Sequence, residues 1–287
     1  MSSISPTENL LAGLSDRQRE AVTHTDGPLL IVAGPGSGKT RVMAHRVAYL
    51  VGEKGIPPWK ILAVTFTNKA ARELRERCEN LVGGGSNELQ VRTFHGFCSR
   101  VLRSDGEQVG LKPEFTIYDA DDQAKVARRI LDQFDIDPKQ FPPRALLSVI
   151  SDAKNNMRSP AQLSRRTETY RDEVAARVYE AYEGALQRAN AVDFDDLLLK
   201  TYQLLEGYPE MLEKYQERFE HLLVDEFQDT NALQFQVARL LALKSRNICV
   251  VGDPDQSIYS WRHADPTNLT DFQSTFQNAK IVTLDQS

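Results

Sequence analysis

The stretch Leu29-Leu30-Ile31-Val32-Ala33-Gly34-Pro35-Gly36-Ser37-Gly38-Lys39-Thr40 decides the fold. Its five apolar residues predict a buried strand, and the stretch that follows the glycine-rich turn predicts a helix over 40–51. The turn matches the P-loop pattern except that Ala33 takes the place of the first glycine. A glycine-rich turn can arise by chance, but one placed between a strand and a helix indicates a phosphate site.

Each residue type in this turn has a physical task. Glycines let backbone N–H groups turn inward around phosphate oxygens, and the helix that starts near Thr40 adds the positive end of its dipole. Lys39 is expected to reach the β- and γ-phosphates of a nucleotide, and Thr40 to ligate Mg²⁺. The other residues expected to hold the phosphates are Gly34, Gly36, Ser37 and Gly38.

A second motif supplies the carboxylates that such a site needs. Leu222-Leu223-Val224-Asp225-Glu226 predicts an apolar strand that ends in two acids. Asp225 is expected to hold Mg²⁺, directly or through water, and Glu226 to polarise an attacking water as general base. An acidic strand end is common when it stands alone. Together with the P-loop it predicts a nucleoside triphosphatase fold, without saying what the hydrolysis drives.

The pattern along the chain predicts one α/β domain in two segments. Apolar runs such as 29–33 and 61–65 alternate with helical stretches over 29–103, and the alternation returns after 192. Strands that alternate with helices favour a parallel sheet covered by helices. Between these segments the pattern is helical, with Asp119 and Ser159-Pro160 as predicted helix starts. We therefore expect an α/β domain from 1–112 and 193–287, interrupted by an all-α inserted domain over 113–192.

Composition narrows the class of protein. The net charge of −5 is uneven, with +4 in residues 1–112, −1 in 113–192 and −8 in 193–287, which is compatible with a local basic groove or with an ordinary mixed surface. No apolar run approaches the roughly 18 residues of a membrane span, and the N-terminal residues lack the pattern of a secretory signal. The three cysteines are far apart, so we expect structural thiols and a cytoplasmic protein without membrane association.

Six further motifs are specific in combination. They follow one another in the chain as Leu14-Ser15-Asp16-Arg17-Gln18, Thr65-Phe66-Thr67-Asn68-Lys69-Ala70-Ala71, Thr93-Phe94-His95-Gly96, Asp193-Phe194-Asp195-Asp196-Leu197, Asp225-Glu226-Phe227-Gln228-Asp229 and Gly252-Asp253-Pro254-Asp255-Gln256-Ser257-Ile258-Tyr259-Ser260-Trp261-Arg262. In this order and spacing, over nearly the whole chain, the series resembles the superfamily 1 DNA helicases of the UvrD/PcrA/Rep type. The resemblance implies a RecA-like P-loop domain that uses ATP and Mg²⁺.

The resemblance also implies roles around the nucleotide. Gln18 matches the position that reads the adenine edge, which an amide can pair with in both directions. Arg41 matches a residue that packs on the adenine ring. Gln256 matches a sensor of the γ-phosphate, and Gln228 matches a link between the nucleotide and DNA sites. The implied catalytic set is Lys39, Asp225, Glu226 and Gln256.

For DNA, the resemblance implies 3′-to-5′ movement on single-stranded DNA and unwinding at single-strand/duplex junctions, in repair or replication. Phe66, Tyr259 and Trp261 match aromatics that stack on bases, a contact that tolerates any sequence as a translocating motor requires. Core packing is the alternative for these aromatics, and His95 fits a buried structural histidine equally well. The other DNA-facing or coupling positions are Thr65, Asn68, Thr93, His95 and Arg262.

Three departures from the family pattern affect the expected activity. His263 stands where glycine is usual, and Gly96 stands where serine is common. In the family, the residues after Ser287 begin with a Tyr-Arg pair, and a second RecA-like domain then supplies another arginine. Because such arginines are worth about 10³–10⁵ in rate, we expect this chain, as a monomer, to bind nucleotide weakly, hydrolyse it slowly and not unwind DNA alone.

Two alternatives remain open at this point. A related helicase–nuclease subunit would share the ATPase motifs, but Asp255-Gln256 and Tyr259-Ser260-Trp261 favour the simpler helicases, and no cluster of nuclease carboxylates is present in the sequence. A DNA- or partner-binding module with an inactive ATP site is the other alternative. The intact Lys39, Asp225 and Glu226 argue against it.

Overall fold

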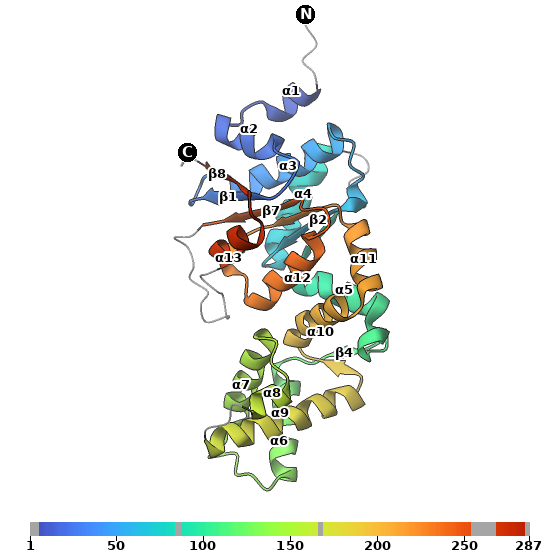
Figure 1. Cartoon of the computed structure of the whole chain (residues 1–287), viewed down its shortest axis with the longest axis vertical. Helices are drawn as coiled ribbons and strands as arrows, with labels where there is room; N and C mark the ends of the chain where they lie inside the picture. Colours follow the sequence, from blue (N-terminus) through green and yellow to red (C-terminus); the bar gives the residue numbers. More distant parts are fainter. Residues whose placement is uncertain (1–5, 84–87, 166–168, 254–267, 285–287) are drawn as a thin grey trace, which may run out of the picture. The chain divides into compact units, whose positions relative to one another are not determined.

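The structure, a computed structural model, describes residues 6–83, 88–165, 169–253 and 268–284 (Figure 1). Of the residues singled out above, Gln256, Tyr259, Trp261, Arg262 and His263 lie outside these ranges. The chain divides into two compact units. The first is formed by Met1–Phe97 together with Leu212–Ser287, and the second by Cys98–Met211.

A six-stranded parallel sheet forms the centre of the first unit, and this confirms the α/β fold class. The order is β3-β2-β6-β7-β1-β8, with β1 (Leu29–Ala33), β2 (Ile61–Thr65), β3 (Gln90–Thr93), β6 (His221–Val224), β7 (Ile248–Gly252) and β8 (Lys280–Leu284). The strands predicted over 29–33 and 61–65 have the same bounds in the structure. Their residues are almost all buried, as expected for strands of a parallel sheet that is covered on both faces.

Helices cover both faces of this sheet (Figure 1). Leu29, Ile31 and Ala33 belong to one apolar cluster with residues of α3 (Lys39–Gly52) and α4 (Asn68–Val82). On the opposite side, Phe227 makes edge-on ring contacts with Phe235 and Phe272. The other helices of this unit are α1 (Pro6–Leu11), α2 (Asp16–Thr23), η1 (Pro58–Lys60), η4 (Phe227–Asp229), α12 (Ala232–Ala242) and α13 (Asn268–Thr275).

Register places the ends of the strands at one edge of the sheet. Because all six strands are parallel, their carboxyl ends meet there, and this edge is where ligands bind in open α/β sheets. β1 leads into the P-loop, β6 into Asp225, and β7 into Asp253. Thr65 and Thr93 are register partners at the ends of β2 and β3. The fold therefore brings the P-loop, Thr65, Thr93, Asp225 and Asp253 to this edge.

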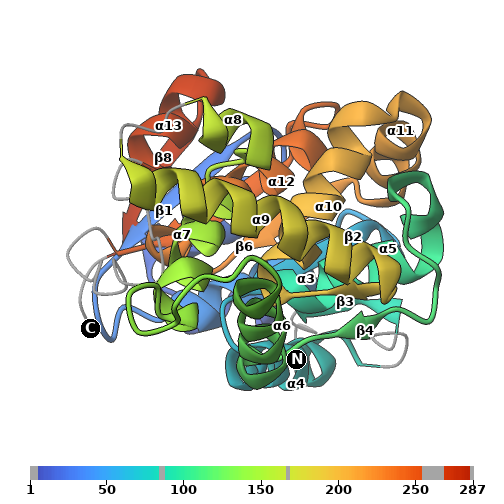
Figure 2. The same cartoon turned by 90° about the horizontal axis from the view of Figure 1, so that it is seen from below.

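The second unit is mainly helical. Figure 2 shows α6, α7 and α8 gathered along α9, and apolar residues of α6, α7 and α9 form its core. Asp119 caps α6 and Ser159 caps α8, as predicted. Its elements are η3 (Gly106–Val109), β4 (Thr116–Ile117), α6 (Ala120–Gln133), α7 (Pro143–Asn155), α8 (Pro160–Ser164), α9 (Tyr170–Arg188), β5 (Ala191–Val192) and α10 (Phe194–Gly207).

This unit differs from the predicted insert in two ways. β4 and β5 form a two-stranded parallel sheet, so the segment is not purely helical, and strands of two residues are too short to leave a periodic signal. The compact unit also extends beyond 113–192 on both sides, because α10 packs against η3, α7 and β5. α5 (Phe94–Asp105) and α11 (Pro209–Arg218) each contain residues of both units.

Two expectations from composition can be compared with the structure. Cys78, Cys98 and Cys249 are buried and form no disulfide, and burial raises the pKa of Cys78 and of Cys98 to about 12. Among the residues that the structure describes, no helix combines the length and the apolar character that crossing a membrane requires.

Candidate nucleotide site and DNA-facing edge

The P-loop has the backbone that phosphate binding requires. Gly36 and Gly38 take left-handed φ angles of 75° and 84°, which L-residues with side chains rarely adopt. The buried Ser37 hydroxyl donates to the Gly34 carbonyl oxygen at 2.7 Å and so braces the turn. α3 begins at Lys39, directly after this turn, so the loop and a helix N-terminus face the same space.

Lys39 lies between the loop and the acidic end of β6. Its Nζ donates to the Ala33 carbonyl oxygen at 3.4 Å and is 3.8 Å from Glu226 Oε2. Both contacts are longer than the 2.7–2.9 Å that is typical of a charge-assisted hydrogen bond. The ammonium group therefore keeps donor capacity for a more strongly charged partner.

Asp225 and Glu226 have different environments although they are neighbours. Asp225 is buried, and its desolvation, together with the charge of Glu226, raises its pKa to about 7. The Glu226 N–H, which donates to Asp225 Oδ1 at 2.9 Å, and the charge of Lys39 oppose this shift. Glu226 is more exposed and has a left-handed φ of 47°, which is a strained conformation for a side-chain-bearing residue. Strain of this kind concentrates at functional sites.

Gln228 connects the two acidic strand ends. Its Nε2 donates to Glu226 Oε2 at 2.8 Å, and its Oε1 accepts from the Asp253 N–H at 3.0 Å. A Cβ at Gly252 would lie 3.0 Å from Gln228 Oε1, so a side chain there would displace the Gln228 amide. The position of the Glu226 carboxylate is thus coupled to the backbone at the end of β7.

The two residues expected beside adenine are bonded to the protein backbone. Gln18 Nε2 donates to the Ser37 carbonyl oxygen at 2.9 Å, and Gln18 Oε1 accepts from the Ser15 N–H at 3.1 Å. Arg41 Nη2 donates to the Gly13 carbonyl oxygen at 3.1 Å. Both side chains therefore lie beside the P-loop, and the Gln18 amide helps to hold its backbone.

The predicted DNA-facing residues follow β2 and β3. Thr65 is buried, and its Oγ1 donates to the Thr67 carbonyl oxygen at 3.1 Å, while half-buried Phe66 and exposed Asn68 follow it. Thr93 Oγ1 accepts from the Gly96 N–H at 3.1 Å, so it caps the start of α5. Burial lowers the pKa of His95, which favours a neutral imidazole. Thr65 and Thr93 are adjacent across the sheet, so these two motifs meet at one place.

Comparison with known proteins decides the family. Residues 14–277 match the family described as "UvrD/REP helicase N-terminal domain". This chain belongs to that helicase family.

Individual relatives agree with this assignment. The chain is 47% identical over 281 residues to a protein of Bacillus subtilis (strain 168) named ATP-dependent DNA helicase PcrA, covering 98% of this chain and 38% of the relative. It is 46% identical over 278 residues to the protein of the same name from Staphylococcus aureus (strain Mu50), again 38% of that relative. The chain therefore spans about 38% of the length of these curated relatives.

Within this family member, the structure also shows contacts of motif residues that the sequence did not predict. Ser15 and Gln18 form a reciprocal capping box at α2, Thr67 caps α4, and the backbones of Gly252 and Asp253 meet Gln228. The Ser-x-x-Gln spacing could have revealed the first of these. The contacts to Gln228 join residues 25 positions apart in the chain, and no local pattern predicts them.

A metal at this site would depend on few protein ligands. Over the described part of the chain, no group of three His, Cys, Asp or Glu side chains is arranged to hold a metal ion. Mg²⁺ at nucleotide sites usually takes one or two protein oxygens and completes its shell with phosphates and water. Asp225, buried beside Lys39, and Thr40 at the start of α3 fit that pattern.

Proposed function

We propose that this chain is the ATP-binding part of an ATP-dependent DNA helicase that moves 3′ to 5′ on single-stranded DNA. The observation that carries the proposal is the approach of Lys39 Nζ to Glu226 Oε2, at 3.8 Å, between the P-loop and the end of β6. Membership of the helicase family and the printed names of the relatives support it. The proposed substrates are ATP with Mg²⁺ and single-stranded DNA, including single-strand/duplex junctions.

In the proposed site, each side chain has one task. The N–H groups of Gly34, Gly36, Ser37 and Gly38 and the Lys39 ammonium would bind the phosphates. Gln18 and Arg41, which are bonded to the backbone of Ser37 and Gly13, would contact the adenine. Thr40 and Asp225 would hold Mg²⁺, which neutralises charge on the β- and γ-phosphates. The chemistry also requires ionised Asp225, because a protonated carboxyl is a poor metal ligand.

Glu226 would act on the attacking water. In the structure its carboxylate contacts Lys39 and accepts from Gln228. When phosphates enter, Lys39 exchanges its long contact with Glu226 for shorter ones to the phosphates. Glu226 then accepts a proton from the water that attacks the γ-phosphorus, while the bond from the γ-phosphorus to the β–γ bridging oxygen breaks and ADP leaves. Gln228 orients the Glu226 carboxylate and links it to the backbone at Asp253, whose N–H donates to Gln228 Oε1. Gln256, outside the described residues, is proposed to contact the γ-phosphate.

DNA would bind at the carboxyl edge of the sheet. Phe66 follows β2 and is half-buried, and we propose that it stacks on a base. Asn68, Thr93 and His95 are proposed as neighbouring contacts, together with Tyr259, Trp261 and Arg262 from the part of the chain outside the described ranges. Thr65 is buried, and we propose that it acts indirectly by holding the Thr67 carbonyl. Base stacking contributes about 1–3 kcal/mol per base without sequence preference. We propose that the chain binds DNA as a monomer and that it does so in the cytoplasm.

The nucleotide proposal is tested with Lys39→Ala. We expect at least a tenfold loss of affinity for a fluorescent ATP analogue with Mg²⁺, about 1.4 kcal/mol, because the ammonium contributes charge-assisted hydrogen bonds. Affinity for single-stranded DNA should stay within about twofold. Lys54→Ala, at an exposed lysine after α3, is the matched control. Equal nucleotide affinity in the two variants would refute the site.

The DNA proposal is tested with Trp261→Ala. We expect loss of about 1–3 kcal/mol in single-stranded DNA affinity, measured by fluorescence anisotropy, with little change in nucleotide binding. The control is Trp59→Ala, since Trp59 is also a tryptophan and is 48% exposed on η1. If Trp261→Ala lowers only the melting temperature, the stacking role is wrong.

A further inference from the structure

The second unit contains a polar hollow that none of the helicase motifs explains. It has a volume of about 420 Å³ and lies at the turn between α7 and α8, where it is lined by Asn156, Met157, Arg158, Gln162 and Arg165. The other hollow described in this unit, about 250 Å³, is lined largely by apolar side chains such as Phe141, Leu146 and Val149. Two guanidinium groups in a polar, open hollow suit an anionic ligand.

The charge around this hollow is opposite in sign to the net charge of the whole chain. The stretch 154–171 has five lysine and arginine residues and one acidic residue, although the whole chain carries a net charge of −5. One of the five, Lys154, is fully buried and paired with carboxylates, so it does not contribute to the surface. Arg158, Arg165 and Arg171, the other basic residues that the structure describes in this stretch, are half-buried or exposed and place positive charge at the surface.

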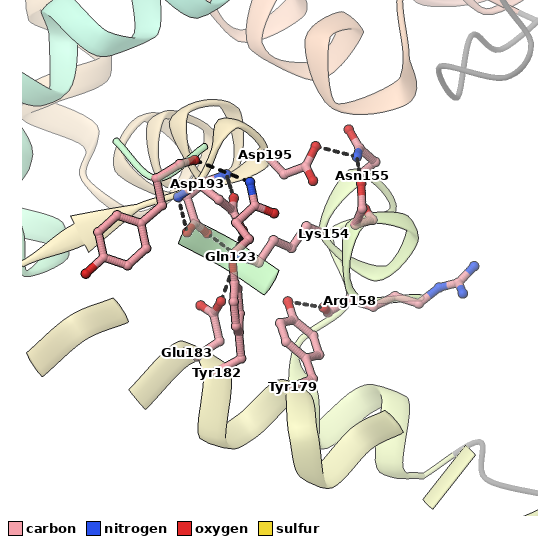
Figure 3. A network of polar contacts seen from close by, with 12 residues as sticks. Gln123, Lys154, Asn155, Arg158, Tyr179, Tyr182, Glu183, Asp193 and Asp195 are labelled. Atoms are coloured by element: carbon pink, nitrogen blue, oxygen red, sulfur yellow. Dashed lines mark hydrogen bonds and ion pairs between the residues drawn. The ribbon is translucent and has the colours of Figure 1, made fainter. Parts of the chain in front are cut away.

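The turn that carries Arg158 is anchored from both sides (Figure 3). Before it, Lys154 binds three carboxylates, and Asn155 Nδ2 donates to Asp195 Oδ1 at 2.9 Å. At the turn, the Tyr179 hydroxyl donates to the Arg158 carbonyl oxygen at 3.1 Å, and the Arg158 N–H donates to the Ala153 carbonyl oxygen at 2.8 Å. The Arg158 side chain is directed away from this buried cluster. The backbone is thus rigid while the guanidinium faces outward.

The hollow keeps donors available. Arg158 Nη1 is 3.7 Å from Asp152 Oδ2, too long for a strong charge-assisted hydrogen bond. Arg165 has no carboxylate within 4.0 Å among the side chains that the structure describes. Gln162 Oε1 accepts from the Ser159 N–H at 2.8 Å in the capping box, which leaves the Gln162 amide nitrogen as a donor.

We propose that this hollow, with Arg158, Arg165 and the Gln162 amide, binds the phosphodiester backbone of a nucleic acid. Guanidinium groups match the geometry of phosphate oxygens in pairs, and such contacts position nucleic acid without reading its sequence. An open polar hollow suits a backbone that passes along it, whereas a free nucleotide would also need a surface for its base. The inference rests on the proposed DNA function, because it places an additional DNA contact in the helical unit.

The test measures binding of a duplex with a single-stranded 3′ tail over a range of salt concentrations. We expect Arg158→Ala and Arg165→Ala each to weaken binding about threefold to tenfold at low salt. Each should also reduce the slope of log affinity against log salt by about 0.7 to 0.9. The matched control is Arg129→Ala, which removes the same charge from an exposed position on α6. Arg158→Lys and Arg165→Lys should retain the salt slope and lose part of the affinity, since lysine keeps the charge without the paired geometry.

The outcomes separate this inference from the proposed function. One outcome is that the wild-type chain binds the oligonucleotide and that Arg158→Ala/Arg165→Ala has the same affinity and salt slope as Arg129→Ala. In that case the hollow is not a DNA contact, and the helicase proposal stands. If the unchanged chain does not bind the oligonucleotide, both fail. Binding of the fluorescent ATP analogue should be equal in all variants, and unequal nucleotide binding would contradict a local effect at this hollow.

Discussion

Lys39 and Lys154 each meet carboxylates from distant parts of the chain, yet their surroundings are opposite. Lys39 is 13% exposed and is 3.8 Å from a single carboxylate. Lys154 is fully buried and lies 2.8 Å from Glu183, Asp193 and Asp196 (Figure 3). Lys154 donates hydrogen bonds to Asp193 and Asp196 and forms an ion pair with Glu183, so carboxylates of the protein surround it at close range. Lys39 is not surrounded in this way, and this difference separates a ligand site from a structural cluster.

The cluster around Lys154 holds the second unit together. Lys154 ends α7, Glu183 and Tyr182 come from α9, and Asp193 with Asp196 begins α10 in a reciprocal capping box. Burial opposes the charge of Lys154, but its three carboxylates outweigh it and hold its pKa well above the usual value. Burial raises the pKa of Asp196 to about 7. One lysine with three ionised carboxylates would leave two excess negative charges in a buried cluster. Partial protonation of Asp196 near neutral pH reduces this excess.

The largest expected effect is on stability, from Lys154→Met. Removing the lysine leaves buried carboxylates without their cation, and we expect a loss of about 3–5 kcal/mol in the free energy of unfolding. Urea unfolding followed by circular dichroism measures it. The matched substitution Lys39→Met, at a lysine with only long contacts, should cost less than about 1 kcal/mol while it abolishes nucleotide binding. Equal costs in the two variants would remove the distinction between site and cluster.

The second prediction concerns pH at the nucleotide site. In the folded chain the pKa of Asp225 is raised to about 7 from its ordinary 3.8. Between pH 3.8 and pH 7, therefore, the folded chain keeps a proton on Asp225 that the unfolded chain has released. This contribution to stability is therefore present at acidic pH and is lost as the pH rises towards 7, with a slope of at most about 1.4 kcal/mol per pH unit. Asp225→Asn should remove it.

The measurement is the difference in the free energy of unfolding between the unchanged chain and Asp225→Asn from pH 5 to pH 7. Other titrating groups, including Asp196, are common to both proteins and cancel in this difference. We expect the unchanged chain to lose stability relative to Asp225→Asn as the pH increases. A constant difference across this range would show that Asp225 is ionised throughout, like a solvated carboxylate.

The sequence predicted the P-loop site around Lys39 better than the cluster around Lys154, because only the P-loop is formed by residues that are neighbours in the chain. The P-loop between β1 and α3 is continuous in the chain, so its strand, its glycines and the start of its helix could be predicted from the residues alone. The sequence marked Asp193-Phe194-Asp195-Asp196 as a motif but did not single out Lys154. That partner is 39 residues from Asp193, and only the packing of three helices brings it close. The short pair β4–β5 was missed because strands of two residues leave no periodic signal.

A smaller effect is expected from the backbone strain at Glu226. Its left-handed φ of 47° costs a side-chain-bearing residue of order 1–3 kcal/mol, and glycine avoids much of this cost. We expect Glu226→Gly to stabilise the chain by about 1 kcal/mol, while Glu226→Gln, which keeps the strained side chain, gains less. Both should abolish ATP hydrolysis in a protein that has it. A destabilised Glu226→Gly would show that the Lys39 and Gln228 contacts outweigh the strain.

The smallest effect compares two identical caps. Ser15 with Gln18 begins α2, and Ser159 with Gln162 begins α8, each as a reciprocal capping box. Ser15→Ala and Ser159→Ala should each cost about 1 kcal/mol or less. Only the Gln18 amide also donates to the P-loop, at the Ser37 carbonyl oxygen. Loosening Gln18 should therefore lower nucleotide affinity about threefold, roughly 0.7 kcal/mol, in Ser15→Ala alone. If both variants or neither lose nucleotide affinity, the Gln18 contact does not support the loop, and the nucleotide site depends on Lys39 and the glycines without it.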